Sequence, residues 1–160
     1  MSNFKEYLLD TNVVIRIWNE YPLLFQAIEK NKEMDYAIYH NIAVEISKKE
    51  FRNIDGVPVL SDKFLKLVGH IINEDLVDTL KISKSDINIK YNKQKDIYIL
   101  NGNKLSRNDY DLICICEKFK KYTLVTGDKG LLNSANIILP PKRVLTFDGF
   151  FADMKKFNVI

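Results

Sequence analysis

The chain has 160 residues, of which 46% are hydrophobic, and a formal net charge of +3 at pH 7. We expect one domain over residues 1–160, and the mixed charges permit a nucleic-acid partner without arguing for one. No apolar run approaches bilayer-spanning length and no secretory signal is visible, so no membrane association is expected. A reduced, cytoplasmic protein fits Cys114 and Cys116, whose spacing disfavours a disulfide.

Short apolar runs alternate along the chain with segments in which apolar residues recur every three or four positions. Such runs predict strands, and such periodic segments predict helices. In chain order we expect a strand at 6–9, helices at 12–19 and 22–31, a strand at 36–39, helices at 42–52 and 62–74, a strand at 76–82, a hairpin at 86–103, a helix at 107–120, a strand at 122–126, a short helical turn from 131, strands at 137–139 and 144–146, and a helix at 148–156. The second half of 86–103 also fits a short helix. This alternation predicts an α/β fold, with a mostly parallel sheet between helical layers.

Two acids end apolar strands of this pattern. Asp10 follows the run that ends at Leu9, and Asp128 follows the strand that ends at Thr126. Ligands of open α/β sheets bind at the carboxyl ends of the strands, which makes both acids candidates for a site. Each acid alone also fits a helix N-cap or a turn, where Asp is common.

Two further acids fall in the first turns of expected helices. Asp109 stands three residues after Ser106, which is the spacing of a capping box, but it also heads an apolar helical stripe and is expected to point inward. Asp111 lies off that stripe and is the weaker candidate. Glu45 follows Asn41, the expected N-cap, and its alternative role is a solvated acid favoured by the helix dipole.

All four acids can lie along one edge of a parallel sheet. Converging carboxylates raise one another's pKa unless a cation relieves their repulsion. All-oxygen ligands favour Mg²⁺ or Mn²⁺, and such a site suits phosphoryl chemistry. The predicted catalytic and metal-binding residues are Asp10, Glu45, Asp109 and Asp128.

Four stretches, in this order, resemble the PIN-domain ribonucleases, which include the VapC-type toxins of toxin–antitoxin pairs. They are residues 7–15, 42–46, 105–109 and 124–129. The resemblance implies an α/β/α sandwich and metal-dependent endoribonuclease activity on single-stranded RNA or a structured RNA loop, with the four acids as ligands of Mg²⁺ or Mn²⁺. It also implies that Asn12 and Thr126 support the acids through hydrogen bonds.

The chain departs from the family pattern in three places. His40 and Asn41 stand where Ser or Thr is common, and Asp111 could share or take the role of Asp109. The segment 83–103 is longer than expected, as an insertion near the substrate or as a solvated loop. From charge and position, our guesses for RNA-backbone contacts are Arg16, Arg107 and Lys129. A toxin would have a cognate antitoxin as a partner, and a homodimer is a further hypothesis.

Two other functions stay open. A catalytically idle PIN-like module would bind RNA or protein with the same fold, although four gathered carboxylates argue for catalysis. An Asp-dependent phosphohydrolase of the haloacid-dehalogenase type wants an acid two residues after Asp10. The chain has Asn12 there, which disfavours this alternative.

Overall fold

Five parallel strands form the centre of the computed structural model, which describes residues 4–50, 52–59, 61–73 and 87–160. These strands are β1 (Lys5–Leu9), β2 (Met34–Tyr39), β5 (Ile71–Ile72), β9 (Tyr122–Val125) and β10 (Val144–Leu145). Their order is β10-β9-β1-β2-β5, and each neighbouring pair is parallel. The chain therefore builds outward from β1 in one direction to β5, and then from β9 in the other direction to β10. The order reverses between β1 and β9, which is the point where such sheets open a crevice for ligands.

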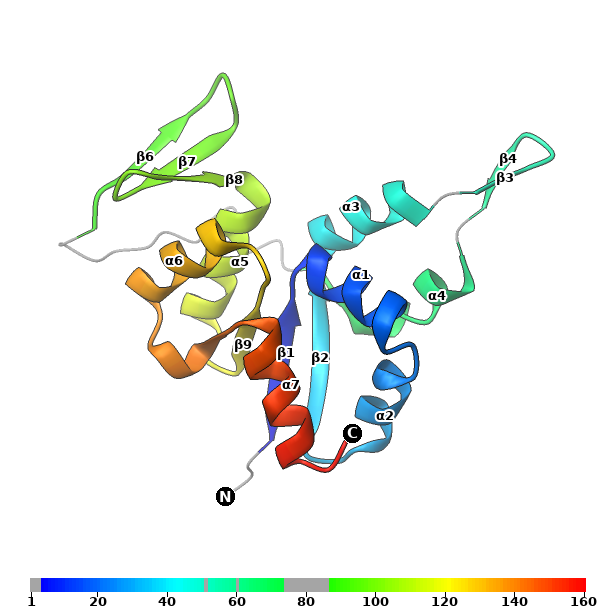
Figure 1. Ribbon diagram of the computed structural model, residues 1–160. Coiled ribbons are helices and arrows are strands. Elements are labelled where there is room, and N and C mark those ends of the chain that lie inside the picture. Colours follow the sequence, from blue (N-terminus) through cyan, green and yellow to red (C-terminus); the bar gives the residue numbers. More distant parts are fainter. Residues whose placement is uncertain (1–3, 51, 60, 74–86) are drawn as a thin grey trace.

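Helices cover both faces of this sheet and complete a three-layer α/β/α fold (Figure 1). Because crossovers between parallel strands are right-handed, the reversal of strand order sends the helices to opposite faces. One face carries α1 (Thr11–Glu20), α2 (Leu24–Lys30), α3 (His40–Glu50) and α7 (Phe147–Lys156), and the other carries α5 (Arg107–Lys118) and α6 (Lys129–Ile138). The ring of Phe150 in α7 packs against Tyr7 of β1, with their centroids 5.1 Å apart. The predicted α/β fold is confirmed.

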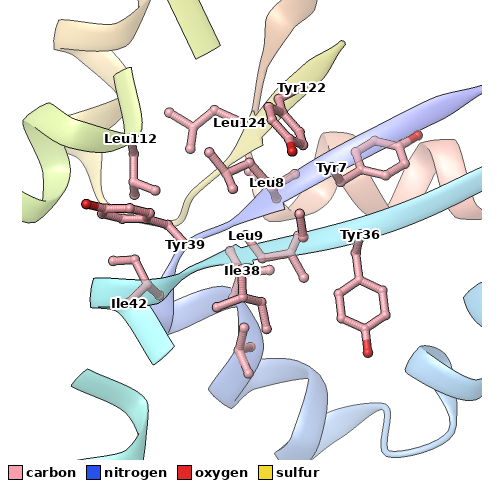
Figure 2. Close-up of a cluster of buried hydrophobic side chains, with 14 of the residues drawn as sticks. Tyr7, Leu8, Leu9, Tyr36, Ile38, Tyr39, Ile42, Leu112, Tyr122 and Leu124 are labelled. Atoms are coloured by element: carbon pink, nitrogen blue, oxygen red, sulfur yellow. The ribbon is translucent and has the colours of Figure 1, made fainter. Parts of the chain in front are cut away.

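The core lies on both sides of β1. Leu8 and Leu9 are fully buried although they point to opposite faces, as expected for a central parallel strand. Figure 2 shows them among side chains from the neighbouring strands and from helices of both layers, including Ile42 of α3 and Leu112 of α5. This packing holds the carboxyl end of β1 in place and, with it, the residue that follows.

Three sequence predictions about these elements are wrong. The expected helix at 62–74 ends early: α4 spans Asp62–Leu65, a one-turn 3-10 helix follows at Val68–His70, and Ile71 pairs with Ile38 as edge strand β5. The expected strand at 137–139 is instead the end of α6 and the residue that follows it. Asn41 does not cap its helix, because α3 begins one residue earlier at His40. The strand expected at 76–82 lies outside the described residues.

Two small antiparallel sheets project from the body (Figure 1). One is a hairpin of β3 (Arg52–Ile54) and β4 (Val57–Val59), in a segment for which no strand was predicted. The other contains β6 (Ile89–Asn92), β7 (Ile97–Leu100) and β8 (Asn103–Ser106), so the hairpin expected at 86–103 is confirmed and the alternative helix is wrong. The third strand, β8, was not predicted. It runs directly into α5 and so connects this sheet to the helix of Asp109.

Candidate active site

Asp10 lies at the reversal of strand order, between the end of β1 and the start of α1. Its side chain caps α1 by accepting a hydrogen bond from the Thr11 N–H (2.8 Å), and its other oxygen accepts one from the Thr126 hydroxyl (2.8 Å). Asp10 is only 5% exposed. Burial raises its pKa, as do the carboxylates of Glu45 and Asp128, whereas the hydrogen bonds from Thr126 and Thr11 lower it. The capping interpretation of Asp10 is therefore confirmed.

Asn12 and Thr126 connect the ends of β1 and β9. The Asn12 amide donates to Asp10 (3.4 Å), and its oxygen accepts a hydrogen bond from the Gly127 N–H (3.0 Å). The Thr126 hydroxyl, which donates to Asp10, also accepts from the Asp128 N–H (3.0 Å). Both residues therefore fix the orientation of Asp10 and the path of the chain into the next acid.

Asp128 and Glu45 reach the same region from other elements. Asp128 caps α6 by accepting a hydrogen bond from the Leu131 N–H (3.1 Å). Glu45 projects from α3 and accepts a hydrogen bond from the Thr11 hydroxyl (2.7 Å). Since Thr11 follows Asp10 directly, this contact places the carboxylate of Glu45 near that of Asp10.

Asp109 occupies the first turn of α5 and is partly buried. Its N–H donates to the Ser106 hydroxyl (3.1 Å), which confirms the predicted cap. Burial raises the pKa of Asp109 to about 7, and the carboxylates of Asp10 and Asp128 contribute to that rise. A group with this pKa exchanges its proton near neutral pH, which is a common property of residues in active sites.

All four acids line one cavity of about 700 Å³. The complete lining is Asp10, Thr11, Asn12, Ile15, Arg16, Asn19, Glu20, Glu45, Lys49, Ser106, Asp109 and Asp128. The sequence had not singled out Asn19, Glu20 or Lys49. Two of these residues could have been found from helical spacing. Asn19 lies seven residues after Asn12, and Lys49 lies four residues after Glu45, so each pair shares a helix face.

The basic residues guessed as RNA contacts divide into two groups. Arg16 lines the cavity, pairs with Glu20 and lies 4.1 Å above the ring of Phe147. Arg107 and Lys129 are not among the cavity residues. Lys49 is a second cation in the lining.

The structure brings Asp109, and not Asp111, to the cavity. Asp111 is 5% exposed on α5 and is absent from the lining. It contributes instead to the raised pKa of Cys114 and of Tyr98. Cys114 and Cys116 are free, as their spacing predicts, and both are buried.

The donor chemistry of the cavity suits a hard divalent cation, because it offers carboxylate oxygens from four elements. Within the described residues, none of the four acids forms an ion pair. In that same part of the chain, no group of three or more His, Cys, Asp or Glu side chains is arranged to hold a metal ion. The four carboxylates thus share a cavity and an electrostatic field without forming a closed ligand set, so their side chains would have to rotate to converge on an ion.

Comparisons with known proteins add support for the fold only. No family model and no curated protein matches the chain. Among solved structures, the chain is similar to the crystal structure of PAE2754 from Pyrobaculum aerophilum, with a TM-score of 0.56 and 14% sequence identity over 95% of this chain and 90% of that one. At this identity the likeness shows a shared fold. Separately, no helix in the described parts of the chain is long and apolar enough to cross a membrane.

Proposed function

We propose that this protein is a metal-dependent endoribonuclease of the PIN type. The observation that carries the proposal is the position of four acids from different elements, Asp10, Glu45, Asp109 and Asp128, around one cavity where the strand order reverses. The raised pKa of Asp10 and of Asp109 supports it: burial is the main cause of both rises, and neighbouring carboxylates, which no ion pair within the described residues offsets, add to them. The four sequence stretches that resemble PIN ribonucleases contain these same acids.

In this proposal the four acids bind a metal ion, and neighbouring side chains orient them. The four carboxylates would hold Mg²⁺ or Mn²⁺, which when bound supplies a Lewis acid and positive charge for hydrolysis of a phosphodiester. Thr126 and Asn12 orient Asp10 by donating hydrogen bonds to it, and Thr11 orients Glu45 in the same way. In the metal-free protein the Asp109 carboxyl group has a pKa of about 7, so binding of the ion would release its proton near neutral pH.

The substrate of the proposed enzyme is single-stranded RNA or a structured RNA loop. Arg16 and Lys49 supply the cationic side chains of the cavity that would contact the sugar–phosphate backbone. The toxin hypothesis adds an antitoxin, or a second copy, as a protein partner. Exposed apolar residues on the β3–β4 hairpin, Ile54 and Val57, offer a surface for such contacts.

A second candidate is a catalytically idle module that binds RNA or protein. The observation that favours it is that, among the described residues, no closed set of metal ligands is formed. The phosphohydrolase alternative has no comparable support, because Asn12 uses its amide to hold Asp10 and Gly127.

An RNA cleavage assay separates these functions. Wild-type protein and an Asp10→Asn variant are incubated with end-labelled single-stranded RNA in Mg²⁺ or Mn²⁺, with and without EDTA. We expect internal cleavage by the wild type that EDTA abolishes and that the folded variant lacks. Asp62→Asn, which changes an exposed acid of α4 outside the cavity, is the matched control and should cleave normally. Full activity in Asp10→Asn would refute the assignment, and a wild type that binds but does not cut would favour the idle module.

A further inference from the structure

We propose that the outer face of the β6–β7–β8 sheet, together with the β6–β7 turn, binds the RNA backbone and leads it into the cavity. We call the four residues Lys90, Lys93, Lys95 and Lys104 the lysine platform. The role rests on the proposed function in one respect, namely that RNA is the substrate.

Positive charge is concentrated in this segment. Residues 87–106 contain the four lysines and a single acid, Asp96, so their net charge of +3 equals that of the whole chain. Everything outside the segment is balanced. The exposed phenol Tyr91 donates a hydrogen bond to Asp96 (2.6 Å), so the one acid is already engaged. A local excess of cations on an otherwise neutral protein is the electrostatic footprint of a polyanion site.

Strand register places two of the lysines on the outer face, one on each side of β7. Lys90 of β6 pairs with Ile99 of β7, and Ile99 pairs with Lys104 of β8. Directly paired residues point to the same side of a sheet, so Lys90 and Lys104 flank Ile99. The opposite side carries Leu100 and Leu105, both buried against the body. The lysine face is therefore the one that looks away from the core.

The platform lysines are available to a ligand. All four are exposed, and none forms an ion pair within the residues that the structure describes. Lys93 and Lys95 lie in the β6–β7 turn, which Asn92 orders by accepting hydrogen bonds from the N–H groups of Gln94 (3.1 Å) and Lys95 (3.2 Å). The turn cations are thus held at a defined end of the sheet.

The platform is continuous with the cavity through β8. Ser106 lies two residues after Lys104 and therefore on the same face of the sheet. Ser106 also lines the cavity and caps the helix of Asp109. Figure 1 shows β8 leading directly into α5. An RNA chain that lies along the lysine face would reach the cavity at Ser106.

The cavity itself cannot supply the charge that a polyanion requires. Its lining contains five acids, the four candidate ligands and Glu20, against two cations, Arg16 and Lys49. Arg16 is already paired with Glu20. Without a bound metal ion such a wall repels phosphate groups, and Arg16 and Lys49 do not outweigh its five acids, so most of the affinity for the backbone has to come from cations beside the cavity. The lysine platform meets that need at the rim that Ser106 forms. This position favours RNA over an acidic protein segment as its occupant.

The test measures RNA binding without cleavage. The 160-residue Asp10→Asn protein in EDTA is titrated against a fluorescein-labelled single-stranded 20-nucleotide RNA at several salt concentrations. The platform is changed as a face pair (Lys90→Gln with Lys104→Gln), as a turn pair (Lys93→Gln with Lys95→Gln) and as all four together. The matched control is Lys30→Gln with Lys32→Gln, two exposed lysines before the amino end of β2, at the edge of the sheet opposite the cavity.

We expect the salt dependence of log K to weaken by about 0.7 per lysine removed, as for cations that contact single-stranded phosphates. Over four lysines this corresponds to a loss of affinity on the order of a hundredfold at 0.15 M salt. Each pair should cause part of this loss and the control none, with unchanged melting temperatures throughout. When Asp10 is kept as in the wild type, the four-lysine variant should lose more of its cleavage of the 20-nucleotide RNA than of its cleavage of a tetranucleotide.

Three results would overturn the inference. They are unchanged binding by the four-lysine variant, an equal loss in the Lys30/Lys32 control, and capture of a poly-glutamate peptide by the platform while RNA binding stays intact. Failure of the nuclease proposal looks different. A wild type that does not cleave RNA, but loses RNA binding when the platform is changed, refutes the nuclease and keeps the platform. If the wild type cleaves RNA and the four-lysine variant cleaves it equally well, the platform is refuted and the nuclease proposal is kept.

Discussion

Asp109 is expected to destabilise the metal-free protein above neutral pH. Its pKa is raised from 3.8 to about 7, first by burial and then by the carboxylates of Asp10 and Asp128. The folded state therefore keeps the Asp109 proton over a pH range in which the unfolded chain has lost it. The stabilisation is complete below the unfolded pKa, declines as the pH rises, and is gone above the folded pKa of about 7. Replacing Asp109 with Asn removes the ionisation and keeps the shape of the side chain.

The magnitude follows from the size of this pKa change. A full shift of that size is worth roughly 4 kcal/mol, and solvent screening of a partly exposed carboxylate reduces it to about 1–2 kcal/mol. The substitution also gives up a favourable helix-dipole interaction of about 0.5 kcal/mol. Asp109→Asn should therefore stabilise the metal-free protein at pH 8 by about 1 kcal/mol, which raises the melting temperature by about 3 °C.

Thermal denaturation in EDTA at pH 5 and pH 8 measures this effect. The variant should exceed the wild type at pH 8 by more than at pH 5, and Asp62→Asn, which changes an exposed first-turn acid, should show no such pH dependence. Addition of Mn²⁺ should then raise the melting temperature of the wild type more than that of Asp109→Asn. A variant that is less stable than the wild type at pH 8, or a difference that is the same at both pH values, would refute this account of Asp109.

Two further substitutions test the contacts that hold the site and the sheet. Thr126→Val removes the buried hydroxyl that donates a hydrogen bond to Asp10 and accepts one from the Asp128 N–H. It should lower the free energy of unfolding in urea by about 1–3 kcal/mol and reduce RNA cleavage, whereas Thr126→Ser should retain both stability and cleavage. A stable and active valine variant would contradict the role of the hydroxyl. Arg143→Met removes hydrogen bonds to three backbone carbonyls around the end of α5 and the start of β9. The urea midpoint should fall by an amount equivalent to roughly 2–4 kcal/mol in the free energy of unfolding. An unchanged midpoint would show that these carbonyls find other partners.

The acids at the strand ends were predictable because their signals are local. An apolar run that ends directly before Asp10, or three residues before Asp128, marks a buried strand that emerges at the carboxyl edge of the sheet. The capping role of Ser106 was predictable for the same reason, since the capping serine and the N–H that it accepts are three residues apart. In each case the residues that decide the structure are neighbours in the chain.

The wrong and missing elements depend on distant partners. Ile71 and Ile72 continue a helical apolar pattern, but they form a two-residue strand because they pair with the edge of β2. The segment Asn103–Ser106 has weak strand preference. It forms β8 because pairing with the open edge of β7 and burial of Leu105 stabilise the strand. No pattern within either segment records the strand against which it will pair.

The cavity and the lysine platform divide the electrostatics of the proposed function between two surfaces. The platform's cations are exposed, and in the described part of the chain none forms an ion pair, so they suit a polyanion that arrives from solution. The acids of the cavity are held by caps and hydroxyls, which fix their positions and leave their mutual repulsion in place. Hydrogen bonds of this kind orient charges without neutralising them, so a cation from outside the chain relieves the repulsion best. Stability and function should consequently diverge at Asp109, where Asn strengthens the metal-free fold and weakens its response to Mn²⁺.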